Sequence, residues 1–171
     1  MMGMDFCVVK SVSRLRNDIL RVMSYDILAF DPSSTKDSDF PGWWADQSSW
    51  SEDHSYNDIA VTTPALREFY ADLIKTFPPM NGPDSPTNDE IDKDSSLEGR
   101  LTDYAIGTSL IYGAFAWSQE SEARQLFTSL AAKHRVAVAL VSDGDEILRP
   151  PAASDRLTRA KPARKRLWGR K

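Results

Sequence analysis

The amino-acid sequence predicts an α+β fold, in which a small, mainly antiparallel sheet carries two helices on one face. Two observations lead to this expectation. The first is the order of the elements, which runs strand, helix, strand or hairpin, helix, strand. The second is that each predicted helix has a single apolar face, so each covers a sheet on one side only. The split βαβ (ferredoxin-like) arrangement is the simplest that fits this order.

The first strand and the first helix are separated by an unusually long segment. Residues 24–30 alternate well enough for a strand. The helix begins after Thr63, a residue type that caps helices, with Pro64 at the first helical position, where a missing N–H costs nothing. Pro78 and Pro79 end it. Its apolar face consists of Leu66, Phe69, Tyr70, Leu73, Ile74 and Phe77.

The second half of the domain opens with a β-prone stretch and a second helix. Residues 104–117 contain a bend near Ser109 or Gly113, so they form one bent strand or two. Ser118 is the predicted cap of the second helix, with acidic residues in its first turn. The apolar face of this helix holds Ala123, Leu126, Phe127, Leu130 and Ala131.

Two further strands close the domain. Residues 136–141 are apolar without a break, which predicts a strand buried on both faces. The turn-forming run Asp143-Gly144-Asp145 follows. Ile147 and Leu148 then predict a short edge strand.

Charge and composition divide the chain into three parts. Residues 1–22 are an N-terminal extension with four basic and two acidic side chains, either an added helix or a stretch ahead of a natural start at Met23. Residues 23–150 form a single α+β domain with 22 acidic and 9 basic side chains, a net charge of −13. Residues 151–171 hold eight Lys or Arg against one acid, a composition typical of a disordered tail. Within the domain, residues 81–100 read as a polar, acidic, mobile loop.

Length, cysteine usage and hydropathy narrow the class of protein. At 171 residues the chain fits one domain with tails. Its single cysteine, Cys7, excludes an intramolecular disulfide and is typical of a reducing compartment. No apolar run approaches the roughly 20 residues of a transmembrane helix, and residues 1–23 lack the apolar core of a signal peptide. We therefore expect a cytoplasmic protein.

The sequence predicts no metal ion, no cofactor and no catalytic residue. His54 and His134 lie far apart and lack the spacing of paired zinc ligands. We expect His134 to interact with the last carbonyls of the second helix. The acidic residues of 81–100 lack the glycine and the ligand spacing of a calcium loop. Cys7 has no nearby base, and the chain contains no glycine-rich phosphate loop and no nucleophile elbow.

Residues 43–56 are the most informative stretch, because they hold three of the five tryptophans and one of the two histidines. Neither the period of a strand nor that of a helix organises them, so we expect a long aromatic loop inserted between the first strand and the first helix. The rings either pin this loop to the core or anchor a partner, since Trp and Tyr bury large areas at low entropic cost. The candidate partner-binding residues are Trp43, Trp44, Trp50, Glu52, Asp53, His54, Tyr56 and Asp58.

Several motifs resemble a group of small, largely uncharacterised bacterial proteins. These begin Met-Ser-Tyr-Asp before a short apolar strand, as residues 23–30 do. A Trp-rich segment similar to residues 43–56 follows, then a P-A-L-R helix that ends in T-F-P-P-M-N-G-P, here residues 64–83. The resemblance covers residues 23–150 and closes on Arg-Pro, while the basic tail departs from it. Some proteins of this kind resemble immunity proteins paired with interbacterial toxins, which implies a toxin-neutralising role without catalytic residues.

We therefore expect a cytoplasmic binding protein, most simply an immunity protein that neutralises a bacterial toxin domain through an acidic, aromatic-rich surface. An alternative is a small enzyme or ligand-binding domain whose pocket is roofed by residues 43–56 around His54. A third interpretation is a housekeeping protein whose basic tail makes weak contact with nucleic acid, where Trp168 offers a stacking surface.

Overall fold

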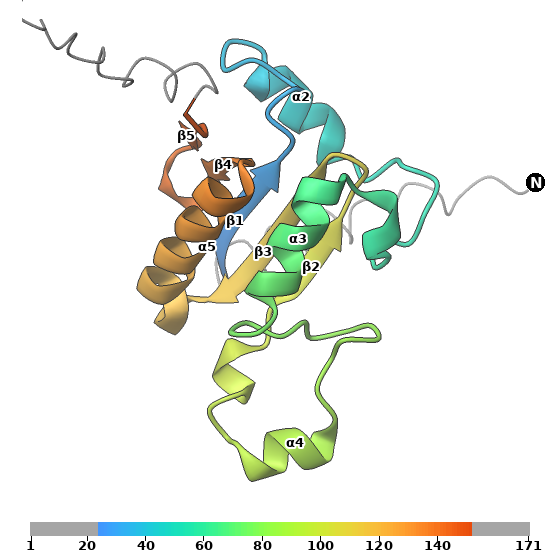
Figure 1. The fold of residues 1–171 in the computed structure, drawn as a ribbon, viewed down its shortest axis with the longest axis vertical. Helices are drawn as coiled ribbons and strands as arrows, with labels where there is room; N and C mark the ends of the chain where they lie inside the picture. Colours follow the sequence, from blue (N-terminus) through green and yellow to red (C-terminus); the bar gives the residue numbers. More distant parts are fainter. Residues whose placement is uncertain (1–23, 152–171) are drawn as a thin grey trace, which may run out of the picture.

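A five-stranded antiparallel sheet forms the centre of the protein. The computed structural model describes residues 24–151; the predicted extension at 1–22, and the predicted tail apart from Pro151, lie outside the described residues. The strands follow one another across the sheet in the order β2-β3-β1-β4-β5, and every neighbouring pair is antiparallel (Figure 1). They are β1 (Ser24–Phe30), β2 (Asp103–Ile106), β3 (Leu110–Ala116), β4 (Ala137–Leu140) and β5 (Glu146–Leu148).

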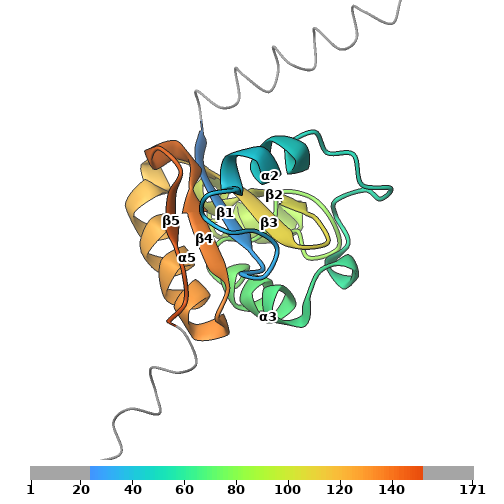
Figure 2. The same cartoon turned by 90° about the horizontal axis from the view of Figure 1, so that it is seen from above.

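The connections between the first four strands have the predicted split βαβ topology. Helix α3 (Pro64–Leu73) lies between β1 and β2 in the chain, and β3 lies between these two strands in the sheet. Helix α5 (Glu120–His134) joins β3 to β4 in the same way, around β1. Both helices cover the same face of the sheet (Figure 2). The expected α+β class, with two helices on one face, is therefore confirmed.

The main core lies between the sheet and these two helices. On β1, Tyr25, Ile27 and Ala29 point to this side and are fully buried. Phe69 from α3 meets Phe127 from α5 edge to face, with ring centroids 4.8 Å apart. The predicted apolar face of the first helix is buried through Leu66, Phe69, Tyr70 and Leu73. These contacts hold the two helices against one another and against the sheet.

The opposite face of the sheet carries a third layer that the sequence did not predict. Helix α2 (Phe40–Gln47) covers it (Figure 2), so the expectation of an irregular loop is wrong for these residues. Leu28 and Phe30 of β1 point to this side and pack with Phe40. The helix has only about two turns and contains Pro41 and Gly42, so its helical period was too short to recognise.

Several element boundaries also differ from those expected. Helix α3 ends at Leu73, and the chain then turns, with the N–H of Phe77 donating to the carbonyl of Leu73. A 3₁₀ turn, η3 (Trp117–Gln119), precedes α5, so Ser118 does not cap this helix. Residues 104–117 form two strands with the turn at 107–109, which settles the bend near Ser109. The apolar run 136–141 contains β4, buried on both faces as predicted, and β5 matches the predicted edge strand.

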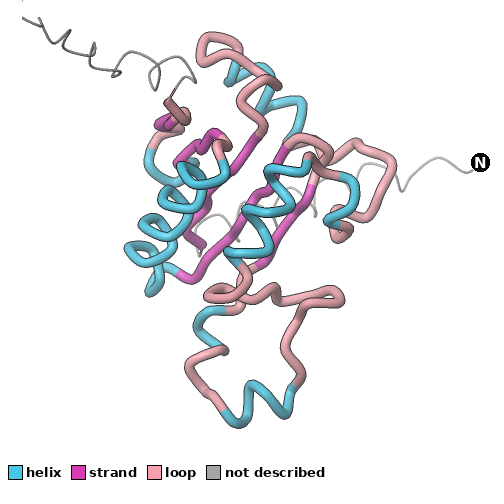
Figure 3. The backbone as a smooth tube through the Cα atoms, in the orientation of Figure 1, coloured by secondary structure: helices cyan, strands magenta, loops and turns pink. Residues whose placement is uncertain are grey.

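Residues 81–100 project from one end of the sheet (Figure 3). Their neck is closed by two backbone hydrogen bonds, from Met80 to the carbonyl of Thr102 and from Thr102 to the carbonyl of Pro78. The predicted loop is wrong in part, because it contains α4 (Asn88–Lys93) and η2 (Glu98–Arg100). A capping box between Thr87 and Glu90 starts α4. Among residues 24–151, no helix has the length and apolar character needed to cross a membrane.

Candidate partner-binding site

The aromatic residues of the long insertion form a continuous layer on the α2 face of the sheet. Trp43 packs against Phe30 of β1 and Phe40 of α2, with ring centroids 5.3 and 5.8 Å away. Trp44 stacks on Tyr112 of β3 at 5.8 Å. All three of Trp43, Trp44 and Trp50 are half-buried, so each ring is both pinned to the sheet and partly open to solvent.

Beyond α2 the layer continues through a strained turn. Trp50 meets Trp44 edge to face at 6.2 Å and Tyr56 at 5.3 Å. Both Trp50 and Tyr56 have left-handed backbones, with φ of 51° and 58°. Bulky residues adopt this conformation at a cost, which the surrounding packing must offset. The carbonyl of Tyr56 accepts from the N–H of Ile106 at 2.8 Å, and this bond ties the turn to β2.

Glu52 fastens the same turn to the β2–β3 hairpin. Its Oε2 accepts from the N–H of Thr108 at 2.9 Å and also from the Thr108 hydroxyl. Although partial burial opposes ionisation, the hydrogen bonds from Thr108 and His54 hold the pKa of Glu52 below its usual range. A Cβ on Gly107 would lie 2.9 Å from Glu52 Oε1 and 3.1 Å from Leu110 Cγ. Glycine at position 107 therefore leaves the room that this carboxylate occupies.

His54 is held inside the turn by both of its ring nitrogens. Nε2 lies 2.6 Å from Glu52 Oε2, and Nδ1 accepts from the N–H of Tyr56 at 3.1 Å. An Nδ1 that accepts leaves the proton on Nε2, which then donates to Glu52. Both ring nitrogens of His54 are thus engaged by groups of the turn itself.

The two other acidic candidates of the turn remain on the surface. Asp53 is exposed. Asp58 is also exposed and caps η1 (Ile59–Val61), with Oδ1 accepting from the N–H of Ala60 at 2.8 Å. Between residues 31 and 58 the chain carries seven acidic side chains and one basic one, so the segment that contains α2 is strongly acidic.

Three further acidic residues belong to this face and were missed in the sequence. Asp37, Asp39 and Asp46 are exposed, in the loop before α2 or on the helix itself. Their relation to Trp43 becomes visible only once residues 40–47 are known to be helical, because Asp39, Trp43 and Asp46 then recur at i, i+4 and i+7. The i, i+4, i+7 spacing is present in the sequence, but it points to Asp39 and Asp46 only when a helix is expected at residues 40–47.

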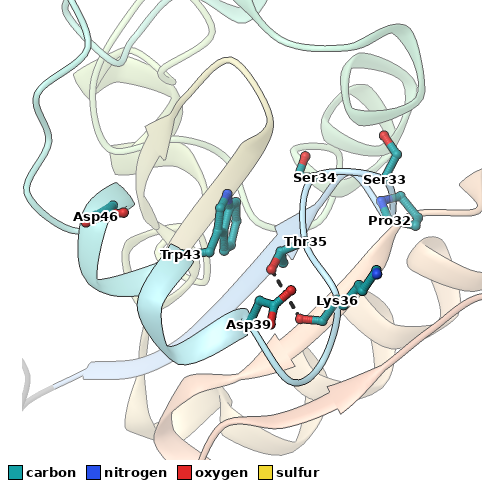
Figure 4. Close-up of a pocket in the computed structure, with 8 residues that line it drawn as sticks. All are labelled: Pro32, Ser33, Ser34, Thr35, Lys36, Asp39, Trp43 and Asp46. Atoms are coloured by element: carbon teal, nitrogen blue, oxygen red, sulfur yellow. Dashed lines mark hydrogen bonds between the residues drawn. The ribbon is translucent and has the colours of Figure 1, made fainter.

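A groove of ≈ 670 Å³ opens between α2 and the loop that follows β1 (Figure 4). Trp43 is the aromatic residue that lines it; His54 is not part of this lining. The loop wall is anchored by Arg149, the residue that follows β5, since its guanidinium donates to the carbonyls of Pro32 at 2.8 Å and Thr35 at 2.7 Å. The groove is lined by Pro32, Ser33, Ser34, Thr35, Lys36, Asp39, Trp43 and Asp46.

His134 lies on the opposite side of the sheet, between α3 and α5. Its Nε2 is 2.9 Å from Asp72 Oδ2, so the expected contact with the last helix carbonyls is wrong. Asp72 also accepts from Lys133 and Lys75, at 2.6 Å each, and these bonds together lower its pKa. In the part of the chain that the structure describes, no group of three or more His, Cys, Asp or Glu side chains is placed to hold a metal ion.

Comparison with known proteins identified no relative of this chain. No protein-family model, no curated protein and no solved structure matches the chain.

Proposed function

We propose that this chain is a cytoplasmic inhibitor protein of the immunity type, which binds and neutralises a bacterial toxin domain. The binding surface is the α2 face, with the half-buried rings of Trp43, Trp44 and Trp50 as its apolar centre. Asp39, Asp46, Asp53 and Asp58 surround these rings with negative charge.

The observation that carries this proposal is the joint placement of rings and carboxylates. An aromatic centre with a charged rim is the usual composition of a protein–protein interface. The rings are held by Tyr112 and Phe30 of the sheet, and the turn after them is tied to Thr108, so the surface is formed before a partner arrives. A preformed surface loses less conformational entropy on binding.

The charge of this surface favours a cationic partner. A domain with a net charge of −13 attracts a basic protein over several ångströms and speeds its association. Toxin domains that act on nucleic acid need cationic sites for the phosphate backbone. An acidic surface that occupies such a site would block the substrate.

The alternative of an enzyme centred on His54 receives less support. Its imidazole is engaged at both nitrogens, by Glu52 and by the backbone of Tyr56. The groove beside α2 is lined by Trp43 and not by His54. A general base would need a nitrogen directed at a substrate.

The test begins with affinity capture from the native bacterium, followed by purification of the captured protein and an assay of its toxicity with and without this chain. We expect a basic toxin domain that loses activity in a one-to-one complex. A captured metabolic enzyme with unchanged activity would contradict the proposal.

A matched pair of charge variants then locates the surface. Neutralising Asp39, Asp46, Asp53 and Asp58 to Asn should slow association at low salt and flatten its salt dependence. The control removes the same charge from residues 81–100, at Asp84, Asp89, Asp92 and Glu98, where exposed carboxylates lie away from α2. Equal effects of the two sets would show that net charge alone matters, not the α2 face.

A further inference from the structure

We propose that the groove beside α2 binds an arginine side chain of the partner, with its guanidinium between the Trp43 ring and the carboxylates of Asp39 and Asp46. This inference rests on the proposed function and specifies what its surface recognises.

The three residues lie along one side of the same short helix. Asp39 occupies the N-cap position of α2 without a side-chain capping hydrogen bond, Trp43 lies one turn later and Asp46 lies in the last turn, which places them on one face. All three line the groove, and Figure 4 shows the Trp43 indole between the two carboxylates. A cation entering the groove therefore meets an aromatic ring flanked by two negative charges.

Both carboxylates are available to a cation. Asp39 and Asp46 are exposed, and within residues 24–151 neither has a Lys, Arg or His within ion-pair distance. Asp39 accepts a hydrogen bond from the neighbouring Ser38 hydroxyl at 2.9 Å. By contrast, Asp37 in the same loop is paired with Arg149. The fold thus neutralises one carboxylate of this region and leaves two along the groove.

The ring and the opposite wall suit a guanidinium. The Trp43 ring packs on Phe30 and Phe40, and Trp43, which is only partly buried, also lines the groove. Trp is the strongest aromatic partner for a cation, and a planar guanidinium also binds carboxylates through two parallel hydrogen bonds. The loop wall adds the hydroxyls of Ser33, Ser34 and Thr35 as acceptors. Arg149 holds this wall in place through the carbonyls of Pro32 and Thr35.

Lys36 allows a second test of the proposed arginine site, in which a substitution should strengthen binding rather than weaken it. It lines the same groove, so its ammonium offsets one of the two carboxylates and repels an incoming cation. Removing this charge should strengthen arginine binding, whereas removing Asp39 or Asp46 should weaken it. A role of the groove in binding anions would reverse both signs.

The experiment follows the Trp43 indole N–H by ¹H–¹⁵N NMR on the full chain, with the signal assigned through Trp43→Phe. The probe is Nα-acetyl-arginine amide, and the control probe is Nα-acetyl-citrulline amide, which has nearly the same shape and no charge. We expect a saturable shift with arginine, with a Kd on the order of millimolar for so small a ligand, and at least about tenfold weaker binding of citrulline.

Four variants complete the test. Asp39→Asn and Asp46→Asn should each weaken arginine binding by about threefold or more, and Lys36→Gln should tighten it. Asp89→Asn, on α4, should leave it unchanged. Equal binding of arginine and citrulline, or equal behaviour of Asp39→Asn and Asp89→Asn, would overturn the proposal. Tighter binding of Nα-acetyl-lysine amide than of the arginine probe would overturn the choice of arginine.

Failure of the arginine-binding test can be distinguished from failure of the proposed toxin-neutralising function. A toxin partner whose affinity is unchanged by Asp39→Asn and Asp46→Asn would retain the function and reject the groove. Arginine binding by a chain that inhibits no toxin would retain the groove and reject the function.

Discussion

Glu52 and Thr108, 56 positions apart in the chain, are joined by two hydrogen bonds that end on the same carboxylate oxygen. One bond is donated by the backbone N–H of Thr108 and the other by its hydroxyl. Because Thr108 lies in the β2–β3 hairpin and Glu52 in the turn after α2, the two bonds connect these segments. Trp50 and Tyr56 flank Glu52 in this turn, so we expect their position to depend on the Glu52–Thr108 contact.

Replacing Glu52 should loosen the turn and destabilise the protein. The Glu52 side chain is 25% exposed, and bonds to a charged acceptor that is partly screened lead us to expect a loss of about 1–2 kcal/mol for Glu52→Ala. Urea denaturation measures this loss. The exposed neighbour Asp53→Ala is the control, with an expected change within about 0.5 kcal/mol. Equal stabilities of the two variants would show that the Thr108 contact does not hold the fold.

The same contact should make stability depend on pH in a defined direction. The pKa of Glu52 is lowered from 4.5 in the folded protein, so its ionised form favours folding. This contribution is complete above pH 4.5 and is lost as the pH falls through the lower folded-state pKa. The difference in Tm between the wild-type protein and Glu52→Gln should therefore shrink below pH 4.5. A difference that stays constant down to pH 3 would contradict the assignment.

Phe69 should be one of the costliest positions in the main core. Its ring is fully buried and meets Phe127, so Phe69→Ala leaves a cavity between α3 and α5 and should cost about 3–5 kcal/mol. Met80→Ala is the control, because that side chain is 49% exposed and should change stability little. A loss below about 1 kcal/mol at Phe69 would mean that α3 does not pack on the sheet in solution.

Quenching of tryptophan fluorescence should distinguish the exposed Trp117 from the half-buried Trp43, Trp44 and Trp50. Trp117 is 47% exposed, whereas Trp43, Trp44 and Trp50 are half-buried on the sheet. In a Trp168→Phe background, Trp117→Phe should remove the largest part of the fluorescence that acrylamide quenches. Trp44→Ala should cost about 2 kcal/mol, roughly half the value for a fully buried ring, because of its stack on Tyr112. Strong quenching that survives Trp117→Phe would indicate that the layer lies open.

Local pattern was sufficient for most of the main fold. The apolar face of the first helix repeats long enough to show its period, and Pro64 marks its start, although the helix ends at Leu73, before Pro78. The unbroken apolar run at 136–141 predicted a strand buried on both faces, which β4 is. Element order then selected the split βαβ topology, because few arrangements bury two one-sided helices against a small sheet.

The candidate site depended on tertiary structure. Helix α2 spans about two turns, too few to show a period, and its stability comes from packing Phe40 and Trp43 on Phe30 rather than from helix propensity. The sequence by itself determined which residue types gather between the first strand and the first helix, and that the region is acidic. Only the tertiary structure decided that Glu52 and His54 are held internally while Asp39 and Asp46 line a groove, because contacts between residues distant in the chain leave no local pattern.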